Sequence, residues 1–244
     1  MISHDDLVFD EYNEGCVISH TDIPKDVMDM CHSLHCVPLA PRIAHLIQSV
    51  RESSGKKRIH KLTYACVYFS LVEANHPVTI KSFAAQFQLD PHALNRTLSL
   101  IKSVTLHNEV STPSHSPDLF LPKVCRIISE CQEIKVTPLQ TLSASMLDII
   151  RKRVDGMNQK HPSFVCCIAV LVALGGILGS KPPDEAMQAL CHDFALSLER
   201  LKTHYYKAID SIIHHINSLN LPYLSTLSRT SIYPHLQDLL PHLM

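Results

Sequence analysis

The sequence contains no tryptophan and only six glycines among its 244 residues. Few glycines, together with abundant leucine, isoleucine and alanine, favour an all-helical protein over one built from strands and tight turns. The 15 prolines do not contradict this prediction. Pro41, Pro91, Pro138 and Pro162 each stand just before an apolar periodic run. In the first turn of a helix the missing N–H of proline costs nothing.

The chain also lacks an excess of charge of either sign, since its formal net charge is −1. No overall positive field therefore attracts nucleic acid, and any DNA binding has to come from local patches and help from a partner. The nine cysteines are scattered and odd in number, and the sequence does not start with a signal peptide. This pattern indicates a reducing compartment, the cytosol or the nucleus, where cysteine serves as a small core residue.

Long hydrophobic runs are absent too. The stretch from Phe164 to Gly179 is continuously uncharged and mostly apolar, and it has 16 residues. A membrane-spanning helix needs roughly 20 residues. We therefore predict no membrane span, and a helix that is buried on all sides and ends at the Gly175-Gly176 pair and Gly179.

Sequence patterns of known catalytic sites are missing. There is no glycine-rich phosphate loop, serine nucleophile elbow or His-Glu-x-x-His helix, so we predict no enzyme and no cofactor. Residues 31–36, Cys-His-Ser-Leu-His-Cys, could suggest zinc. However, they lack a Cys-x-x-Cys pair and Cys31 lies on an apolar helix face, which favours a core cysteine with surface histidines and no metal.

What the chain does contain is a repeat. The apolar helical pattern of residues 63–74 returns at residues 163–174, with Cys66 and Cys166 in register. Each copy is the third of five helix-like segments. The pattern predicts two tandem five-helix units followed by a C-terminal extension. We expect these parts in chain order: an acidic lead-in (1–20), a first repeat (21–104), a linker (105–118), a second repeat (119–218) and a C-terminal tail (219–244).

This arrangement resembles the paired cyclin boxes of the transcription factor IIB family. Local segments in both repeats carry the resemblance, and it covers about residues 21–215. These segments are Lys56-Lys57-Arg58, Ala65-Cys66-Val67-Tyr68, Thr79-Ile80-Lys81, Arg96 with Leu100-Ile101-Lys102, Lys160-His161-Pro162-Ser163 and Tyr206-Lys207-Ala208-Ile209.

The resemblance implies a nuclear transcription initiation factor. Such a protein binds TATA-binding protein and promoter DNA, and recruits RNA polymerase into the preinitiation complex. Two features depart from the family pattern. Its zinc ribbon is absent from this chain, and Thr203 stands where the family's last helix has an arginine that reads an upstream promoter element.

Basic residues recur at corresponding places in the two repeats. In each repeat they fall between the second and third helices, where lysine and arginine could neutralise phosphates. Others lie on the fifth helices, the recognition-helix position of a helix-turn-helix. Against the alternative of a solvated polar face, we predict DNA contacts at Lys56, Lys57, Arg58, Arg96, Arg153, Lys160, Lys202 and Lys207.

Two other functional classes remain open. A kinase-activating cyclin uses the same doubled box. However, such cyclins usually begin the first box with a Met-Arg docking motif, and residues 25–30, Lys-Asp-Val-Met-Asp-Met, lack it. A structural scaffold with a cyclin-like fold and no role with nucleic acid is the third possibility.

Overall fold

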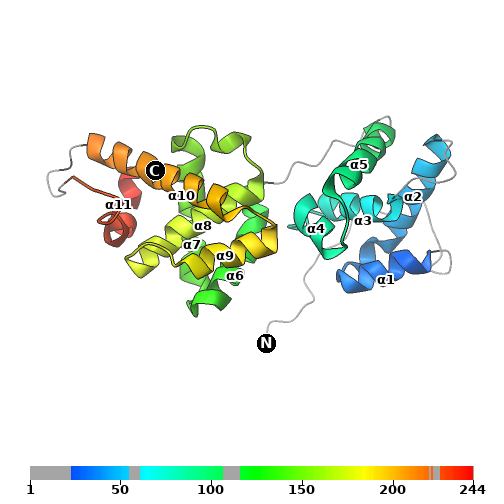
Figure 1. Cartoon of the computed structure of the whole chain (residues 1–244), viewed down its shortest axis with the longest axis horizontal. Helices are drawn as coiled ribbons and strands as arrows, with labels where there is room; N and C mark the ends of the chain where they lie inside the picture. The colour runs from blue at the N-terminus through cyan, green and yellow to red at the C-terminus, as the bar shows by residue number, and fades with distance from the viewer. Residues whose placement is uncertain (1–22, 55–60, 107–115, 220, 222–225, 244) are drawn as a thin grey trace. The chain divides into compact units, whose positions relative to one another are not determined.

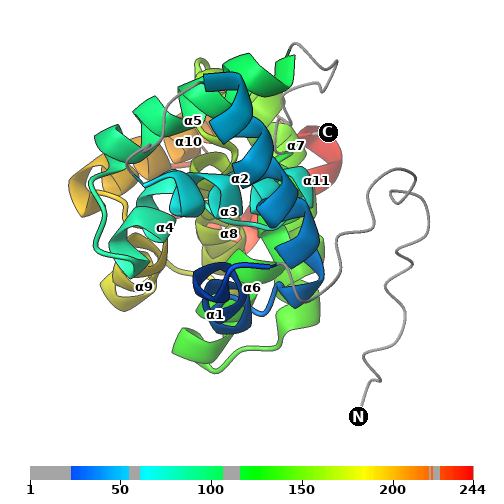
Figure 2. The ribbon, with the colours of Figure 1, turned by 90° about the vertical axis from the view of Figure 1, so that its right-hand side faces the viewer.

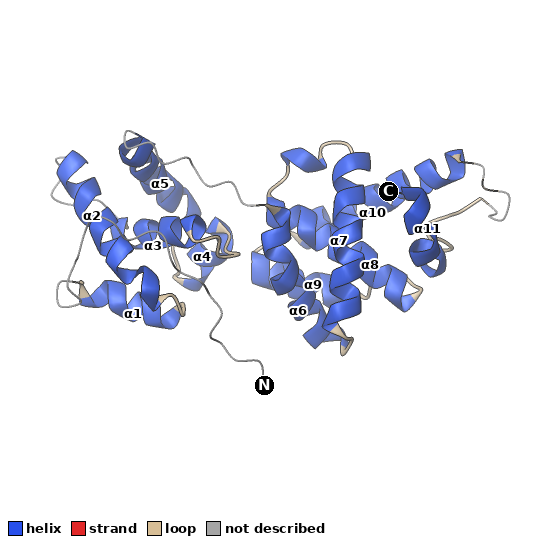
Figure 3. Cartoon of the chain, turned by 180° about the vertical axis from the view of Figure 1, so that it is seen from behind, coloured by secondary structure: helices blue, strands red, loops and turns tan. Residues whose placement is uncertain are grey.

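The computed structural model describes residues 23–54, 61–106, 116–219, 221 and 226–243. These residues form eleven α-helices, joined in places by short 3-10 segments, and contain no strand (Figure 3). The predicted all-helical class is therefore confirmed. Within these residues, no helix combines the length and the apolar character that crossing a bilayer requires.

Among the first five helices, side-chain caps mark the starts of the fourth and the fifth. The five helices are α1 (Lys25–Ser33), α2 (Ala40–Ser54), α3 (Leu62–Glu73), α4 (Ile80–Gln86) and α5 (Pro91–Leu106). Thr79 and Ser82 form a reciprocal capping box at the start of α4. The Asp90 carboxylate accepts the backbone N–H groups of His92 and Ala93 at 3.0 and 3.1 Å, which caps α5. Such caps satisfy backbone donors that the helix itself leaves without partners.

Six further helices follow. They are α6 (Leu121–Gln132), α7 (Val136–Arg153), α8 (Pro162–Leu178), α9 (Asp184–Phe194), α10 (Leu198–Ser218) and α11 (Leu236–Leu243). The 3-10 segment η4 (Met157–Gln159) lies between α7 and α8, and η5 (Tyr233–His235) precedes α11.

The chain divides into two compact units. One comprises Met1–Leu71 with Thr97–Val110, and the other comprises Val72–Arg96 with Ser111–Met244. In the first, α1 packs against α2. The division runs through α3 and α5, so the repeat boundaries expected near residues 104 and 119 stay a prediction.

Helix α8 is the central element of the second unit. It contacts α6, α7, α9, α10 and α11, which surround it (Figure 1). Every residue from Ser163 to Gly176 is buried. A helix that is apolar all round finds partners on every side only at the centre of such a bundle, so the predicted buried helix is confirmed.

The predicted end of this helix was partly wrong. Gly179 does cap α8 in the left-handed conformation, with a φ of 63°. Gly175 and Gly176 instead lie inside the helix, because residues from the C-terminal end of the chain pack closely on them. A Cβ added at Gly175 would lie 2.8 Å from the Tyr233 ring, and one at Gly176 would lie 3.1 Å from Leu236.

The C-terminal extension therefore belongs to the core of the second unit. Leu227, Ile232, Leu236 and Leu239 are all buried in the cluster that includes α8. Helix α11 contacts α7, α8 and α10, and the view in Figure 2 shows it beside α7. Leu236, Leu239 and Leu243 are spaced by three and four residues and so form one buried apolar face of α11, which makes this docking favourable.

Candidate nucleic-acid interface

The structure describes only one of the four basic residues predicted to contact DNA in the first repeat. Lys56, Lys57 and Arg58 lie outside the described residues. Arg96 is exposed on α5. The pKa of Asp90 is lowered below its usual range mainly by hydrogen bonds from the backbone N–H groups of His92 and Ala93, and to a smaller extent by the charge of Arg96.

In the second unit, the basic residues gather at the end of α7. Arg151, Lys152 and Arg153 form the last turn of this helix and are all exposed. Gly156 then adopts a left-handed φ of 76°, which turns the chain into η4, and the half-buried Lys160 follows. Cations in the last turn compensate the partial negative charge of a helix C-terminus.

Side chains from α10 hold this basic segment in place. The Lys207 ammonium donates to the carbonyl oxygen of Asp155 at 3.0 Å, and the Ser211 hydroxyl donates to that of Arg153 at 2.9 Å. Within the segment, the Asn158 amide donates to the carbonyl oxygen of Arg151 at 3.1 Å. The structure thus brings two predicted contact residues, Arg153 and Lys207, onto neighbouring elements.

The face of α10 that carries Lys207 and Ser211 also carries Arg200 and His204, and these two residues contact the start of α8. The Arg200 guanidinium lies 5.3 Å from the centre of the Phe164 ring, a cation–π arrangement. The His204 ring meets Phe164 edge-on, with centroids 5.1 Å apart. Arg200, His204, Lys207 and Ser211 are spaced by four, three and four residues, so they share one face of the helix.

Lys202 points elsewhere. Its ammonium lies 2.9 Å from a carboxylate oxygen of Asp184, at the start of α9. This pairing, together with Lys181 at 3.6 Å, lowers the pKa of Asp184. Lys202 therefore faces a carboxylate, unlike Arg153, which makes no ion pair with any residue that the structure describes. The five-residue spacing of Lys202 and Lys207 also places them on different sides of α10.

The resulting surface is locally basic although the whole chain is not. Without Lys202, which faces Asp184, segments 151–160 and 198–211 together contain six lysines and arginines against three aspartates and glutamates. Clustered cations of this kind attract polyanions even where the net charge is near zero. We call the exposed Arg151, Lys152 and Arg153 of the last α7 turn, together with the half-buried Lys160 that follows them in the chain, the basic face.

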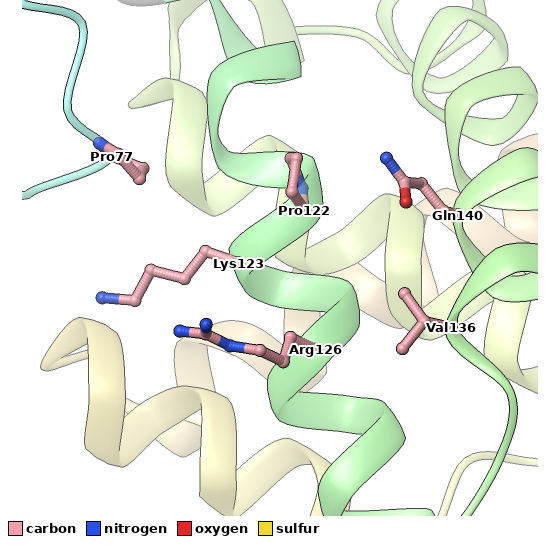
Figure 4. Close-up of a pocket in the computed structure, with 6 residues that line it drawn as sticks. All are labelled: Pro77, Pro122, Lys123, Arg126, Val136 and Gln140. Carbon is pink, nitrogen blue, oxygen red and sulfur yellow. The ribbon is translucent and has the colours of Figure 1, made fainter. Parts of the chain in front are cut away.

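Two other places in the described part of the chain have features of a binding site. A hollow between α6 and α7 is lined by residues that include Lys123, Arg126 and Val136 (Figure 4). Lys123 lies 2.9 Å from Asp193 and Arg126 lies 3.9 Å from Glu130. Because both cations already face carboxylates, the hollow carries no assignment here.

The second of these places is residues 31–36, the Cys-His-Ser-Leu-His-Cys segment. Cys31 and Cys36 are both buried, which confirms Cys31 as a core residue. Burial, reinforced by the neighbouring Cys36, raises the pKa of Cys31 to about 12. Among the described residues there is no cluster of three or more metal-ligating side chains.

The sequence analysis missed two contributors to the basic region, Arg200 and Ser211. Spacing offered a signal for Arg200, because it lies seven residues before Lys207 on the same helical face. Nothing in the sequence marked Ser211, whose partner Arg153 lies 58 residues away. Comparison with known proteins adds no further constraint: no protein-family model matches the chain. No curated protein matches it.

Proposed function

We propose that this chain is a general transcription initiation factor of the type that the transcription factor IIB family represents. It binds TATA-binding protein and promoter DNA in the nucleus and recruits RNA polymerase. In this proposal the five helices α1–α5 and the five helices α6–α10 act as two cyclin-like boxes. The mechanism is binding and bridging, without covalent chemistry.

The observation that carries the proposal is the basic face of the second unit. Exposed Arg151, Lys152 and Arg153 lie at one helix end, beside a segment fastened to α10. Cations presented from a fixed backbone can neutralise successive phosphates and displace condensed counterions. Such contacts position a protein on DNA without reading its sequence.

The sequence resemblance supplies the partners. It compares the loops before α3 and α8 with family loops that touch DNA on either side of a bent promoter box. The near-zero net charge fits a protein whose DNA affinity depends on a second protein. Because the DNA affinity depends on a second protein, we expect weak binding to bare duplex and much tighter binding to a preformed complex of TATA-binding protein and promoter DNA.

A gel-shift titration with promoter duplex tests the proposal directly. We expect the chain to shift a complex of TATA-binding protein and promoter DNA at concentrations far below those needed for bare duplex. Equal affinity for the two probes would contradict the proposal. Retention of a kinase, and not of RNA polymerase, in a pull-down with the full chain would instead favour the kinase-activating cyclin.

A further inference from the structure

The C-terminal end of α7 is an unfavourable place for a phosphate group unless its carbonyl groups are covered. The last four carbonyl groups of a helix lack partners within the helix. They carry about half a negative charge in total, which repels an approaching anion. Three exposed cations of the basic face, Arg151, Lys152 and Arg153, nevertheless lie in this turn.

Side chains cover carbonyl oxygens in and just beyond this turn. The carbonyl oxygens of Arg151, Arg153 and Asp155 accept hydrogen bonds from Asn158, Ser211 and Lys207 respectively. Two of these donors come from α10, 52 and 58 residues away from their acceptors in the chain. The Lys207 ammonium also brings a positive charge to the negative end of the helix.

We propose that Lys207 and Ser211 are positioning residues, which fasten the segment 151–155 to α10 so that Arg151, Lys152 and Arg153 contact DNA phosphates. This inference rests on the proposed function. It assigns two different roles to the residues at the end of α7 and to the α10 residues that bond to them. Lys207 and Ser211 act through the backbone of the α7–α8 connection. The exposed arginines and lysine of the last α7 turn meet the nucleic acid.

The two roles differ in their dependence on salt. Each phosphate contact on duplex DNA contributes about −0.9 to the slope of log K against log salt concentration. Removing a contact residue therefore makes the slope shallower by about that amount. Removing a neutral positioning group lowers affinity at every salt concentration and leaves the slope unchanged.

The decisive variant is Ser211→Ala, which changes no charge. We expect its affinity for a complex of TATA-binding protein and promoter duplex to fall about 3- to 10-fold, the effect of one lost hydrogen bond, with an unchanged salt slope. Ser211→Thr keeps a hydroxyl and should restore the affinity. Lys207→Met should likewise reduce affinity with little change in slope, whereas Lys152→Gln should make the slope shallower by about 0.9.

Ser218→Ala provides the matched control. Ser218 lies on the same helix, and its hydroxyl bonds to the carbonyl oxygen of His215 within α10 at 2.6 Å. This variant should bind like the wild type. Hydrogen exchange should be faster at the backbone amides of residues 154–160 in Ser211→Ala than in Ser218→Ala, whether or not DNA is present.

Three outcomes would overturn the inference in distinguishable ways. If Ser211→Ala binds as tightly as the wild type, the fastening does not matter for binding. If Lys207→Met loses as much slope as Lys152→Gln, Lys207 is itself a phosphate contact. If the wild-type chain shifts no DNA with or without TATA-binding protein, the proposed function fails and the contact role of the α7 turn fails with it.

Discussion

The hydroxyl groups of Tyr205 and Tyr233 lie 2.9 Å apart and form a buried hydrogen bond between α10 and the C-terminal extension. Both side chains are almost completely buried. Burial raises the pKa of each phenol, so both stay protonated and able to share this bond. The Tyr233 ring also covers Gly175, which ties the C-terminal residues to the centre of α8.

Replacing Tyr233 by Phe should destabilise the protein by about 1–3 kcal/mol, because the Tyr205 hydroxyl is then left buried without its partner. Chemical denaturation measures the loss. The double variant Tyr205→Phe with Tyr233→Phe should cost less than the two single losses added together, since no hydroxyl remains unsatisfied. Strictly additive losses would show that the hydrogen bond does not couple the two residues.

Gly175→Ala should also destabilise the second unit, by about 1–3 kcal/mol, because the new methyl group meets a packed core. The added Cβ would lie 2.8 Å from one ring carbon of Tyr233 and 3.3 Å from the carbonyl oxygen of Ser180. Helix propensity alone predicts the opposite sign, a gain of up to about 1 kcal/mol for alanine over glycine. A rise in the free energy of unfolding would therefore mean that the C-terminal extension does not pack on α8 in solution.

The ion pair between Asp210 and Arg229 should make stability depend on pH in the acid range. Arg229 donates to both carboxylate oxygens of Asp210, with Nε at 2.6 Å, and this lowers the pKa of Asp210 below its ordinary 3.8. For a carboxyl group with a lowered pKa, the stabilisation is present above the ordinary value. It is lost as the pH falls through the lower value in the folded protein.

The difference in free energy of unfolding between the wild type and Asp210→Asn should therefore shrink as the pH is lowered below about 3.8. Both side chains are about half exposed, so salt should reduce the difference as well. Asp238→Asn, at an exposed acid on α11, serves as the control. A difference that grows on acidification would have the wrong sign for this pair.

Reversing charge at Lys56 and Lys57 should weaken complexes with DNA. We expect Lys56→Glu with Lys57→Glu to reduce formation of the ternary complex with TATA-binding protein and DNA at every promoter sequence tested, since phosphate contacts carry no sequence preference. A gel shift measures this. Lys25→Glu with Lys135→Glu makes the same change in charge at exposed positions outside the predicted site and should leave binding nearly intact. Unchanged binding of the Lys56/Lys57 variant at low salt would exclude this loop from the interface.

Much of the helical architecture was predictable because local signals agree with one another. Proline and N-cap residues stand where helices start, as Asp90 and Pro91 do for α5. The uniformly apolar run of α8 has only one stable environment, the centre of a bundle. The glycine pair in this helix was wrongly predicted to end it. These glycines instead leave room for Tyr233 and Leu236, which lie more than 50 residues later in the chain.

The roles of the basic residues were also only partly predictable from the sequence. Their clustering between helices was visible in the chain, and the five-residue spacing of Lys202 and Lys207 indicated different directions, but the partner of each was not visible there. Lys202 faces Asp184, whereas Lys207 bonds to the backbone beside Gly156. Each role depends on a partner from another helix, and a single sequence does not specify which helices meet.

The sequence by itself thus determined the helical class, the starts of helices such as α5 and the uniform burial of α8, because caps and periodicity act over a few residues. Only the tertiary structure decided that the C-terminal extension completes the core and that α10 fastens the basic end of α7. Those features depend on contacts such as Tyr205 with Tyr233 and Ser211 with Arg153, between residues 28 and 58 positions apart. Packing selects such pairs by fitting whole helix faces together, and no local pattern encodes that fit.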